Sequence, residues 1–299
     1  ADVTSMTARA LSRDGLSECA RETCRWRAYQ PVDYMRYAEF AAVLQELTIG
    51  PASRVLDVSS PQWFSLCLAR KRPDCQFIYV NLAADEVEPY REIARACGID
   101  NVSYVRMDAR ALACASGLFD TVLSISVIEH VAPERDGDTL AFREIKRVLK
   151  PGGDFILTVP CKEKRNICYR HGSVDGRSGQ EKTFYAREYD SDMFMKLVAR
   201  AGFSVDRILY IGEKTGLFPL DFYAWGPGKG TRRAKIAGYI KQRIEWRMGR
   251  SLDAMLAGHY LSVTTQPTHR LVNLVARLIP ERAEGAINGG AGATGAMRE

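Results

Sequence analysis

The sequence predicts an α/β fold: a doubly wound, mostly parallel sheet with helices on both faces. Five short apolar runs alternate with segments of helical periodicity between residues 54 and 159. Strands of a parallel sheet are buried on both faces, which explains why these runs are almost continuously apolar. Pro151-Gly152-Gly153 ends the last helical segment directly before the fifth run, where glycines let the chain reverse. Together these observations indicate successive strand-helix-strand units.

The individual elements follow in order along the chain. A helix is expected from Asp33, which can cap its first turn, to Leu47, and Gly50-Pro51 stops it. The five strands are expected at residues 54–58, 76–82, 102–107, 121–126 and 154–159, with helices near residues 63–70, 87–97 and 138–149. A later helix (190–201), a strand (203–211) and an antiparallel partner at 217–225 would complete a sheet of seven strands.

The chain divides into four predicted regions. Residues 1–50 form a helical N-terminal extension, residues 51–225 the α/β domain, and residues 226–282 a basic helical C-terminal extension with a second helix near 269–278. Residues 283–299 are rich in glycine and alanine and are expected to be a disordered tail, because they bury too little apolar surface to fold. Residues 161–182 predict a long loop, which compact domains keep for binding or catalysis.

Positive charge is concentrated in one segment. The chain of 299 residues has a net charge of +6, yet residues 229–250 contain eight basic side chains and only one acidic one, Glu245. Ile236, Ile240 and Ile244 recur at four-residue spacing there, which predicts an amphipathic basic helix. Three interpretations stay open: an outer helix packed by its isoleucines, a contact with an anionic membrane surface, or a clamp for an acidic substrate. Nucleic acid is disfavoured, because no nucleic-acid-binding motif accompanies the charge.

Other patterns limit the possible classes of protein. No apolar run approaches the roughly 20 residues that span a bilayer, and no basic-then-apolar leader opens the sequence, so a cytoplasmic location is expected, with peripheral membrane contact if residues 229–250 bind lipid. The eight cysteines include no C-x-x-C pair and the four histidines are dispersed, so neither disulfides nor a metal site is expected.

Several motifs occur in an order that resembles the class I S-adenosylmethionine (SAM)-dependent methyltransferases, in particular their small-molecule and glycan-directed group. The resemblance covers roughly residues 50–212. The motifs are Val55-Leu56-Asp57-Val58, Tyr79-Val80-Asn81-Leu82, Val105-Arg106-Met107-Asp108-Ala109, Phe119-Asp120-Thr121-Val122, Ser126-Val127-Ile128-Glu129-His130-Val131, and the run from Glu144 to Gly153. Each motif is weak alone, but their succession is specific.

The resemblance implies SAM as the cofactor and assigns residues to it. The loop after the first strand would contact the methionine part, Asn81 stands where a carboxylate usually accepts from the ribose hydroxyls, and Asp108 stands where the adenine amino group is bound. Ser126 and Val127 would line the middle of the pocket. The implied cofactor-binding residues are Asp57, Val58, Ser59, Ser60, Pro61, Asn81, Leu82, Asp108, Ala109, Ser126 and Val127. For Asp57 and Asp108, a helix-capping or turn role is the alternative.

Two positions depart from the family pattern. The glycines expected near Ser59, Pro61 and Trp63 are absent, so the loop is stiffer and bulkier than usual. Asn81 loses the charge-assisted part of a ribose contact, worth about 1 kcal/mol. A weaker hold on the cofactor is therefore expected, although Ser59 and Ser60 are small enough to replace glycine contacts.

The resemblance also implies a catalytic pair. Methyl transfer to a hydroxyl requires alignment of the acceptor and removal of its proton, and His130 is the first candidate base, with Glu129 second. A core or capping role is the alternative for His130, and Tyr169, Arg170 and His171 are weaker candidates in the long loop.

Two functions from different classes follow from these residues. The first is methyl transfer to an oxygen, with nitrogen ranked second, of a small molecule, sugar or lipid-linked glycan. The second is a catalytically inactive binding or scaffold protein that keeps the fold. An NAD-linked dehydrogenase is disfavoured, because no G-x-G-x-x-G follows the first strand.

Overall fold

The central sheet of the protein has eight strands among the residues that the structure describes. The structure is a computed structural model, and it describes residues 2–83, 85–171, 182–214, 232–267 and 270–281. The strand order is β3-β2-β1-β4-β5-β10-β8-β9. The strands are β1 (Arg54–Val58), β2 (Gln76–Asn81), β3 (Val102–Arg106), β4 (Phe119–Ile125), β5 (Leu149–Pro160), β8 (Phe203–Glu213), β9 (Leu261–Thr264) and β10 (Arg270–Pro280). The first five are parallel to one another, whereas β10, β8 and β9 pair antiparallel.

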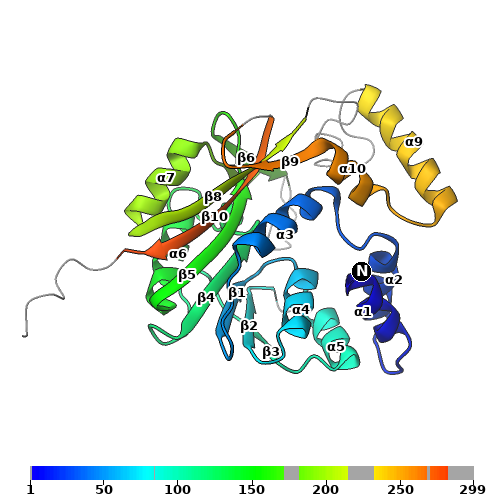
Figure 1. Cartoon of the computed structure of the whole chain (residues 1–299), viewed down its shortest axis with the longest axis horizontal. Helices are drawn as coiled ribbons and strands as arrows, with labels where there is room; N and C mark the ends of the chain where they lie inside the picture. Colours follow the sequence, from blue (N-terminus) through cyan, green and yellow to red (C-terminus); the bar gives the residue numbers. More distant parts are fainter. Residues whose placement is uncertain (1, 84, 172–181, 215–231, 268–269, 282–299) are drawn as a thin grey trace, which may run out of the picture.

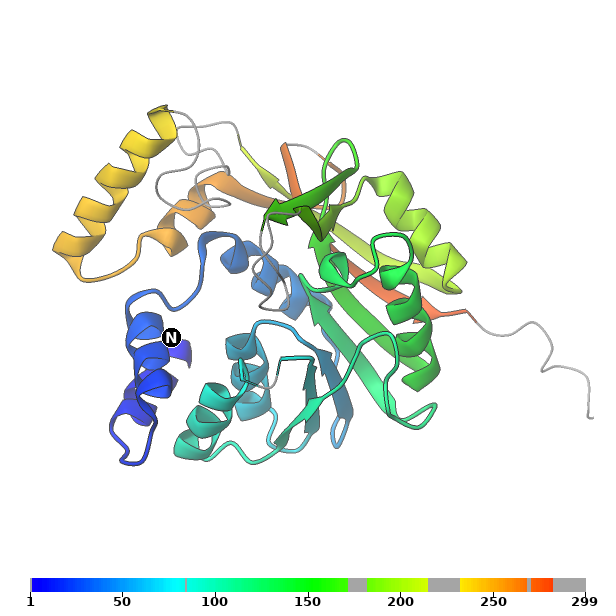
Figure 2. The same ribbon diagram turned by 180° about the vertical axis from the view of Figure 1, so that it is seen from behind.

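Helices cover both faces of this sheet (Figure 1). The helices α3 (Tyr34–Glu46), α4 (Gln62–Lys71), α5 (Glu88–Cys97) and α10 (Asp253–Tyr260) share one apolar core with one face, while α6 (Gly137–Val148) and α7 (Ser191–Arg200) share a second core with the other. Figure 2 shows this second face. Helices α1 (Asp2–Leu11) and α2 (Glu18–Tyr29) pack outside α4 and α5, and α9 (Arg232–Met248) lies at the edge of the molecule.

The predicted α/β class and mostly parallel sheet are confirmed, but the C-terminal part differs from expectation. Residues 270–280, expected within a helical extension, form β10 and lie between β5 and β8 in the sheet. Most residues of this run are apolar, and periodicity alone does not separate a buried helix from a buried strand. Because β9 and β10 both join the central sheet, it has eight described strands, whereas the sequence predicted seven. The strand expected at 217–225 and the tail at 283–299 lie outside the described residues.

Two further segments are more ordered than the sequence indicates. Residues 2–30, which show no clear apolar period, contain α1 and α2. The predicted loop at 161–182 contains all of one strand, β6 (Asn166–His171), and the first residue of another, β7 (Lys182–Glu188), which pair antiparallel. A short 3₁₀ turn, η1 (Ile128–His130), follows β4 and faces this pair. None of the described helices is both long and apolar enough to cross a bilayer.

The position of β10 makes a prediction for truncated chains. A chain ending at residue 267 loses the strand that joins β5 to β8 and the buried Leu274, Val275 and Leu278. Each such side chain contributes roughly 2 kcal/mol, against a total stability of about 5–15 kcal/mol. We expect this chain to be insoluble or unfolded by circular dichroism. A chain ending at residue 281 keeps every described strand and should unfold cooperatively, and equal behaviour of the two chains would contradict the topology.

Candidate functional site

A buried carboxylate fixes α3 over the carboxyl ends of β4 and β5 and the amino end of β10. Glu39 of α3 is fully buried, and its Oε1 accepts hydrogen bonds from Ser126 Oγ (2.8 Å), from Asn273 Nδ2 (2.8 Å) and from Thr158 Oγ1. These three residues follow β4 or lie on β5 and β10. Its Oε2 forms an ion pair with Arg36, one turn earlier on the helix. Because four donors satisfy this carboxylate, the helix is held at one place on the sheet.

The turns that leave β1 and β4 each place a serine in a backbone conformation that favours glycine. Ser59 (φ 55°) and Ser126 (φ 52°) both adopt the left-handed conformation, which costs a residue with a Cβ atom about 1–3 kcal/mol. Hydrogen bonds offset this cost: the Ser59 N–H and Oγ both donate to the carbonyl of Val80 (3.0 and 2.7 Å). Ser59 therefore adopts the same backbone conformation that a glycine would adopt at this position. Its hydroxyl adds a hydrogen bond that glycine could not make.

Asp57 and Ser60 support this turn from behind. Asp57 is buried and accepts from the Ser60 N–H (2.9 Å) and from Ser65 Oγ (2.5 Å) on α4, and burial raises the pKa of its carboxyl to about 6. Ser60 Oγ accepts from the Ile125 N–H (3.0 Å), which ties the turn to β4. Val58 is also buried. These three predicted cofactor residues shape the loop from below and do not line the cavity above it.

A cavity of about 310 Å³ opens at the point where β1 and β4 lie side by side. Ligands of open α/β sheets bind at such a switch point, in cavities of roughly 300–1,000 Å³. The lining residues are Arg27, Pro31, Val32, Asp33, Arg36, Phe40, Ser59, Pro61, Gln62, Trp63, Asn81, Glu86, Ile125 and Ser126. Four of the predicted cofactor residues, Ser59, Pro61, Asn81 and Ser126, thus share one cavity.

Arg36 lines this cavity together with Arg27, and no sequence motif had pointed to it. Its Nη1 donates to Ser126 Oγ (2.7 Å) and pairs with Glu39, so the guanidinium is fixed by two partners. The N-terminus of α4, at Pro61 and Gln62, lines the same cavity and presents the positive end of a helix dipole. Arg36 and Glu39 share a helical face with Phe40 and Val43. Two charged residues within an otherwise apolar stripe are the sequence feature that could have identified Arg36 as a functional residue.

The residues predicted for the adenine end lie outside this cavity. Asp108 is held by Arg110, whose Nε lies 3.0 Å from both carboxylate oxygens and whose Nη2 lies 2.6 Å from Oδ2. Arg110 lowers the pKa of Asp108 and also donates to the carbonyl of Ala132 (2.8 Å). Ala109 is half-buried, Leu82 is mostly exposed, and neither lines the cavity. Asn81 Oδ1 accepts from the Ala83 N–H (2.8 Å).

The Glu129-His130 pair lies in η1, directly after the half-buried Val127. Glu129 is buried, and its Oε2 has no hydrogen-bond partner among the described residues. Burial raises the pKa of Glu129 to about 8; Arg36 opposes this rise and Glu39 adds to it. A carboxyl group in such a place is largely protonated at neutral pH until a cation approaches.

His130 is oriented by the neighbouring strand β7. Its Nδ1 lies 2.7 Å from the carbonyl oxygen of Tyr185, and since a carbonyl only accepts, Nδ1 carries the proton and Nε2 keeps its lone pair. Burial lowers the pKa of His130 below its usual 6.5, so the ring is neutral at pH 7. Nε2 lies 3.8 Å from Glu129 Oε1. The pair therefore combines a neutral base with a buried carboxyl group.

Arg187 of β7 positions the segment that carries this pair. Its side chain is 1% exposed and donates to the carbonyls of Glu129 (3.4 Å), Val131 (2.9 Å), Pro133 and Glu134 (2.6 Å), and its Nε lies 3.3 Å from Asp138 Oδ2. The sequence did not identify Arg187, because a single arginine within a short predicted strand belongs to no recognisable motif. Of the weaker candidates on β6, Tyr169 donates to Glu134 (2.6 Å) and Arg170 stacks on Tyr185, whereas His171 is only placed at the strand end.

Replacement of Arg187 should loosen residues 129–134. Arg187→Met leaves the carbonyls and Asp138 without a donor, and breaking a buried ion pair in this way costs about 3–5 kcal/mol of unfolding free energy. Arg187→Lys keeps the charge but not the planar fork, so the loss should be smaller while amide exchange at residues 129–134 still rises. Urea unfolding and hydrogen exchange measure both effects. The control is Arg200→Met at an exposed position of α7, and equal losses in the control would refute the assignment.

Comparison with known proteins identifies the domain. Residues 56–157 match the family model for a methyltransferase domain. The chain is 32% identical over 114 residues to a sarcosine/dimethylglycine N-methyltransferase of Halorhodospira halochloris; this match covers 38% of the chain and 39% of that relative. The chain thus spans about two fifths of the length of the curated relative.

Solved structures with the same fold include several enzymes. A SAM-dependent methyltransferase from Methanosarcina mazei has a TM-score of 0.50 at 13% identity, covering 80% of this chain and 97% of the other. Coclaurine N-methyltransferase, solved with N-methylheliamine and SAH, has a TM-score of 0.51 at 15% identity, covering 81% and 70%. The [4+2]-cyclase SpnF has a TM-score of 0.50 at 18% identity, covering 82% and 81%, so the fold alone does not fix the reaction. The family match and the shared fold lead to one conclusion: residues 56–157 match a methyltransferase domain, and the chain has the fold of the class I SAM-dependent methyltransferases.

Proposed function

We propose that the protein transfers the methyl group of SAM to a nitrogen atom of a small amine. The observation that carries the proposal is the cavity at the carboxyl ends of β1, β2 and β4, with Arg36 fixed at one side and Glu129 buried close to Arg36. The match of residues 56–157 to a methyltransferase domain supports methyl transfer as the reaction. The scaffold alternative finds no support in the cavity, which retains charged and polar groups suited to a cofactor.

The residues in and beside the cavity fit most of SAM. Arg36 and the N-terminus of α4 would hold the methionine carboxylate, because both present positive charge to the same space. Asn81 would hydrogen-bond to the ribose hydroxyls, and Asp108 would accept from the adenine amino group once Arg110 turns away. When bound, SAM supplies a methyl group that its sulfonium has already activated.

The residues of the Glu129-His130 pair have separate tasks in this mechanism. An amine is mostly protonated at neutral pH and must lose a proton before its nitrogen lone pair can react. Glu129 would release its proton to solvent as the cation approaches, and the resulting carboxylate would hold the ammonium group in place. His130 Nε2 would take the proton, and the Tyr185 carbonyl, which accepts from Nδ1, would stabilise the imidazolium that results.

Two observations favour nitrogen over the oxygen that the sequence ranked first. A buried carboxyl group with an unpartnered oxygen recognises a cation better than a neutral hydroxyl, because pairing removes the cost of its burial. The curated relative is named for N-methylation of sarcosine and dimethylglycine, and coclaurine N-methyltransferase shares the fold. Sugar and lipid-linked glycan acceptors become the second choice, to be compared directly.

Cofactor binding is tested by calorimetry with SAM. We expect binding to the unaltered protein and at least tenfold weaker binding to Arg36→Met, since a charge-assisted contact is worth about 1.5–3 kcal/mol. Arg13→Met, at an exposed position before α2, is the matched control and should bind as the unaltered protein does. Absence of heat at about 1 mM SAM would instead support the scaffold alternative.

The acceptor is tested by methylation of matched amine and hydroxyl compounds with labelled SAM. His130→Ala should reduce turnover at saturating substrate by about 10²-fold or more, because general base catalysis is lost. Turnover of the unaltered protein should fall as the pH drops through the pKa of His130, which lies below 6.5, since the protonated ring cannot accept a proton. His259→Ala, at an exposed position of α10, is the control. Near-normal turnover in His130→Ala removes it as the base, and methylation of hydroxyl compounds alone would overturn the amine assignment.

A further inference from the structure

Helix α9 is attached to the protein through charged side chains. Lys241 Nζ lies 2.7 Å from Glu245 Oε1 and 2.9 Å from Asp253 Oδ1 on α10. Glu245 Oε1 accepts from the Leu252 N–H (2.7 Å), and Asp253 Oδ2 accepts from Gln30 Nε2 (2.8 Å). Glu245 and Asp253 are buried, and the Lys241 side chain is 10% exposed. The inner face of this amphipathic helix is thus an ion-pair network.

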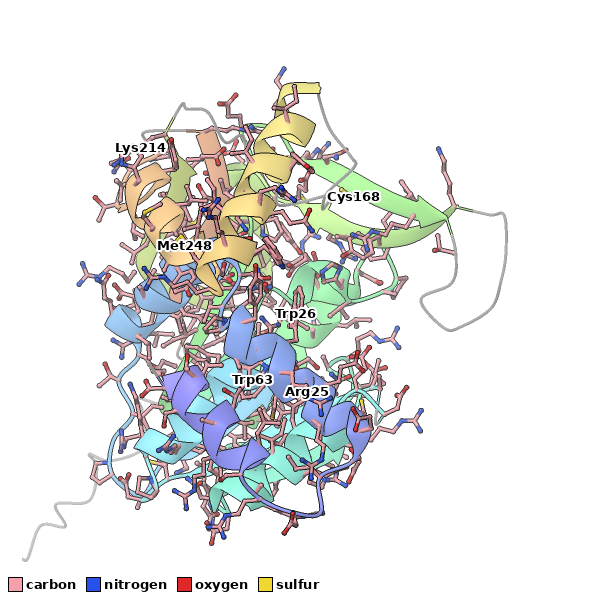
Figure 3. All side chains as sticks on the ribbon, turned by 90° about the vertical axis from the view of Figure 1, so that its right-hand side faces the viewer. Arg25, Trp26, Trp63, Cys168, Lys214 and Met248 are labelled. Atoms are coloured by element: carbon pink, nitrogen blue, oxygen red, sulfur yellow. The ribbon has the colours of Figure 1, made fainter. Side chains whose placement is uncertain are left out.

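The large apolar residues of α9 for which the structure describes side chains face solvent instead. Tyr239 is 64% exposed and Trp246 is 77% exposed, and Ile236, Ile240 and Ile244 are each more than two fifths exposed. The sequence left open that these isoleucines pack the helix against the protein, and the structure reverses that arrangement. A helix on a protein surface normally buries its apolar stripe, so this exposed face requires a partner. Figure 1 shows α9 at the edge of the molecule, and Figure 3 shows Met248 at its C-terminal end.

Positive charge runs along the same exposed face. At about 100° per residue, Arg243 and Arg247 project between the isoleucines on one side and Tyr239 and Trp246 on the other. Both arginines are exposed, as is Arg250 just after the helix. No ion pair joins any of the three to another described residue. The face therefore combines isoleucines, two interfacial aromatics and free guanidinium groups.

We propose that this face of α9 docks the protein on an anionic membrane surface. Isoleucines would enter the boundary between headgroups and acyl chains, Tyr239 and Trp246 would lie at the headgroup level, and the arginines would pair with lipid phosphates. The apolar side chains outnumber the cations on this face, which favours lipid over nucleic acid, where phosphate contacts dominate. A second copy of the chain is disfavoured, because two such faces would oppose like charges.

The proposal is tested by sedimentation with vesicles of phosphatidylcholine alone or mixed with phosphatidylglycerol. We expect binding to the anionic vesicles, at least tenfold weaker binding to the neutral ones, and a steep fall as salt rises from about 0.05 M to about 0.5 M. Ile240→Glu and the double variant Arg243→Glu/Arg247→Glu should each reduce binding at least tenfold. Met195→Glu and Lys196→Glu/Arg200→Glu, at exposed positions of α7, are the matched controls and should bind normally.

Each other outcome overturns the proposal. Salt-insensitive or absent vesicle binding removes the membrane as the partner, and equal losses in the α7 controls show that the effect belongs to total charge. Binding of duplex DNA or RNA without vesicle binding assigns the face to nucleic acid, and a dimer that Ile240→Glu dissociates assigns it to a second copy. All the substituted side chains are exposed, so a melting temperature matched to the unaltered protein confirms that each variant folds.

Discussion

One buried carboxylate, Glu39, sets the geometry on which the candidate site depends. It gathers a hydroxyl from the end of β4, a hydroxyl from β5 and an amide from β10, and it holds the guanidinium of Arg36 beside them. Burying a charge is costly unless every oxygen is satisfied, so the helix and the three strands have one favourable relative position. In that position α3 forms one wall of the cavity and places Arg36 in its lining.

Two serines, Ser59 and Ser126, line the same cavity in a backbone conformation that favours glycine. Ser59 and Ser126 adopt left-handed conformations, and their hydroxyls make hydrogen bonds that a glycine could not make. The expected loss of close backbone approach is therefore partly offset by bonds that fix the turns. Asp57 below the first turn is a supporting group, which was the alternative weighed for it from the sequence. The loop is rigid, and the departure from the family pattern is local.

The opposite side of the site is positioned from far along the chain. The β6–β7 pair brings Arg187 to five acceptors around residues 129–138 and brings the Tyr185 carbonyl to His130. Neither contact joins neighbours in sequence. Glu129 thus owes the raised pKa of its carboxyl group to burial, whereas the His130 ring, whose side chain is 39% exposed, is oriented by the Tyr185 carbonyl of β7. Helix α9 stands apart from this assembly and is held by its own ion-pair network.

The sequence by itself determined the α/β class and the five parallel strands to within a few residues, because strand periodicity and glycine turns are local properties. It identified Ser59, Pro61, Asn81 and Ser126, which the structure brings to one cavity. Tertiary structure decided the rest. Residues 270–280 form a strand because they pair with both β5 and β8. Arg36 and Arg187 belong to the site through contacts with residues distant in sequence, and Asp108 is held by Arg110 outside the cavity. These outcomes depend on which buried donors and acceptors come together in the folded protein. Residues far apart in the sequence make these contacts, so local sequence patterns do not predict them.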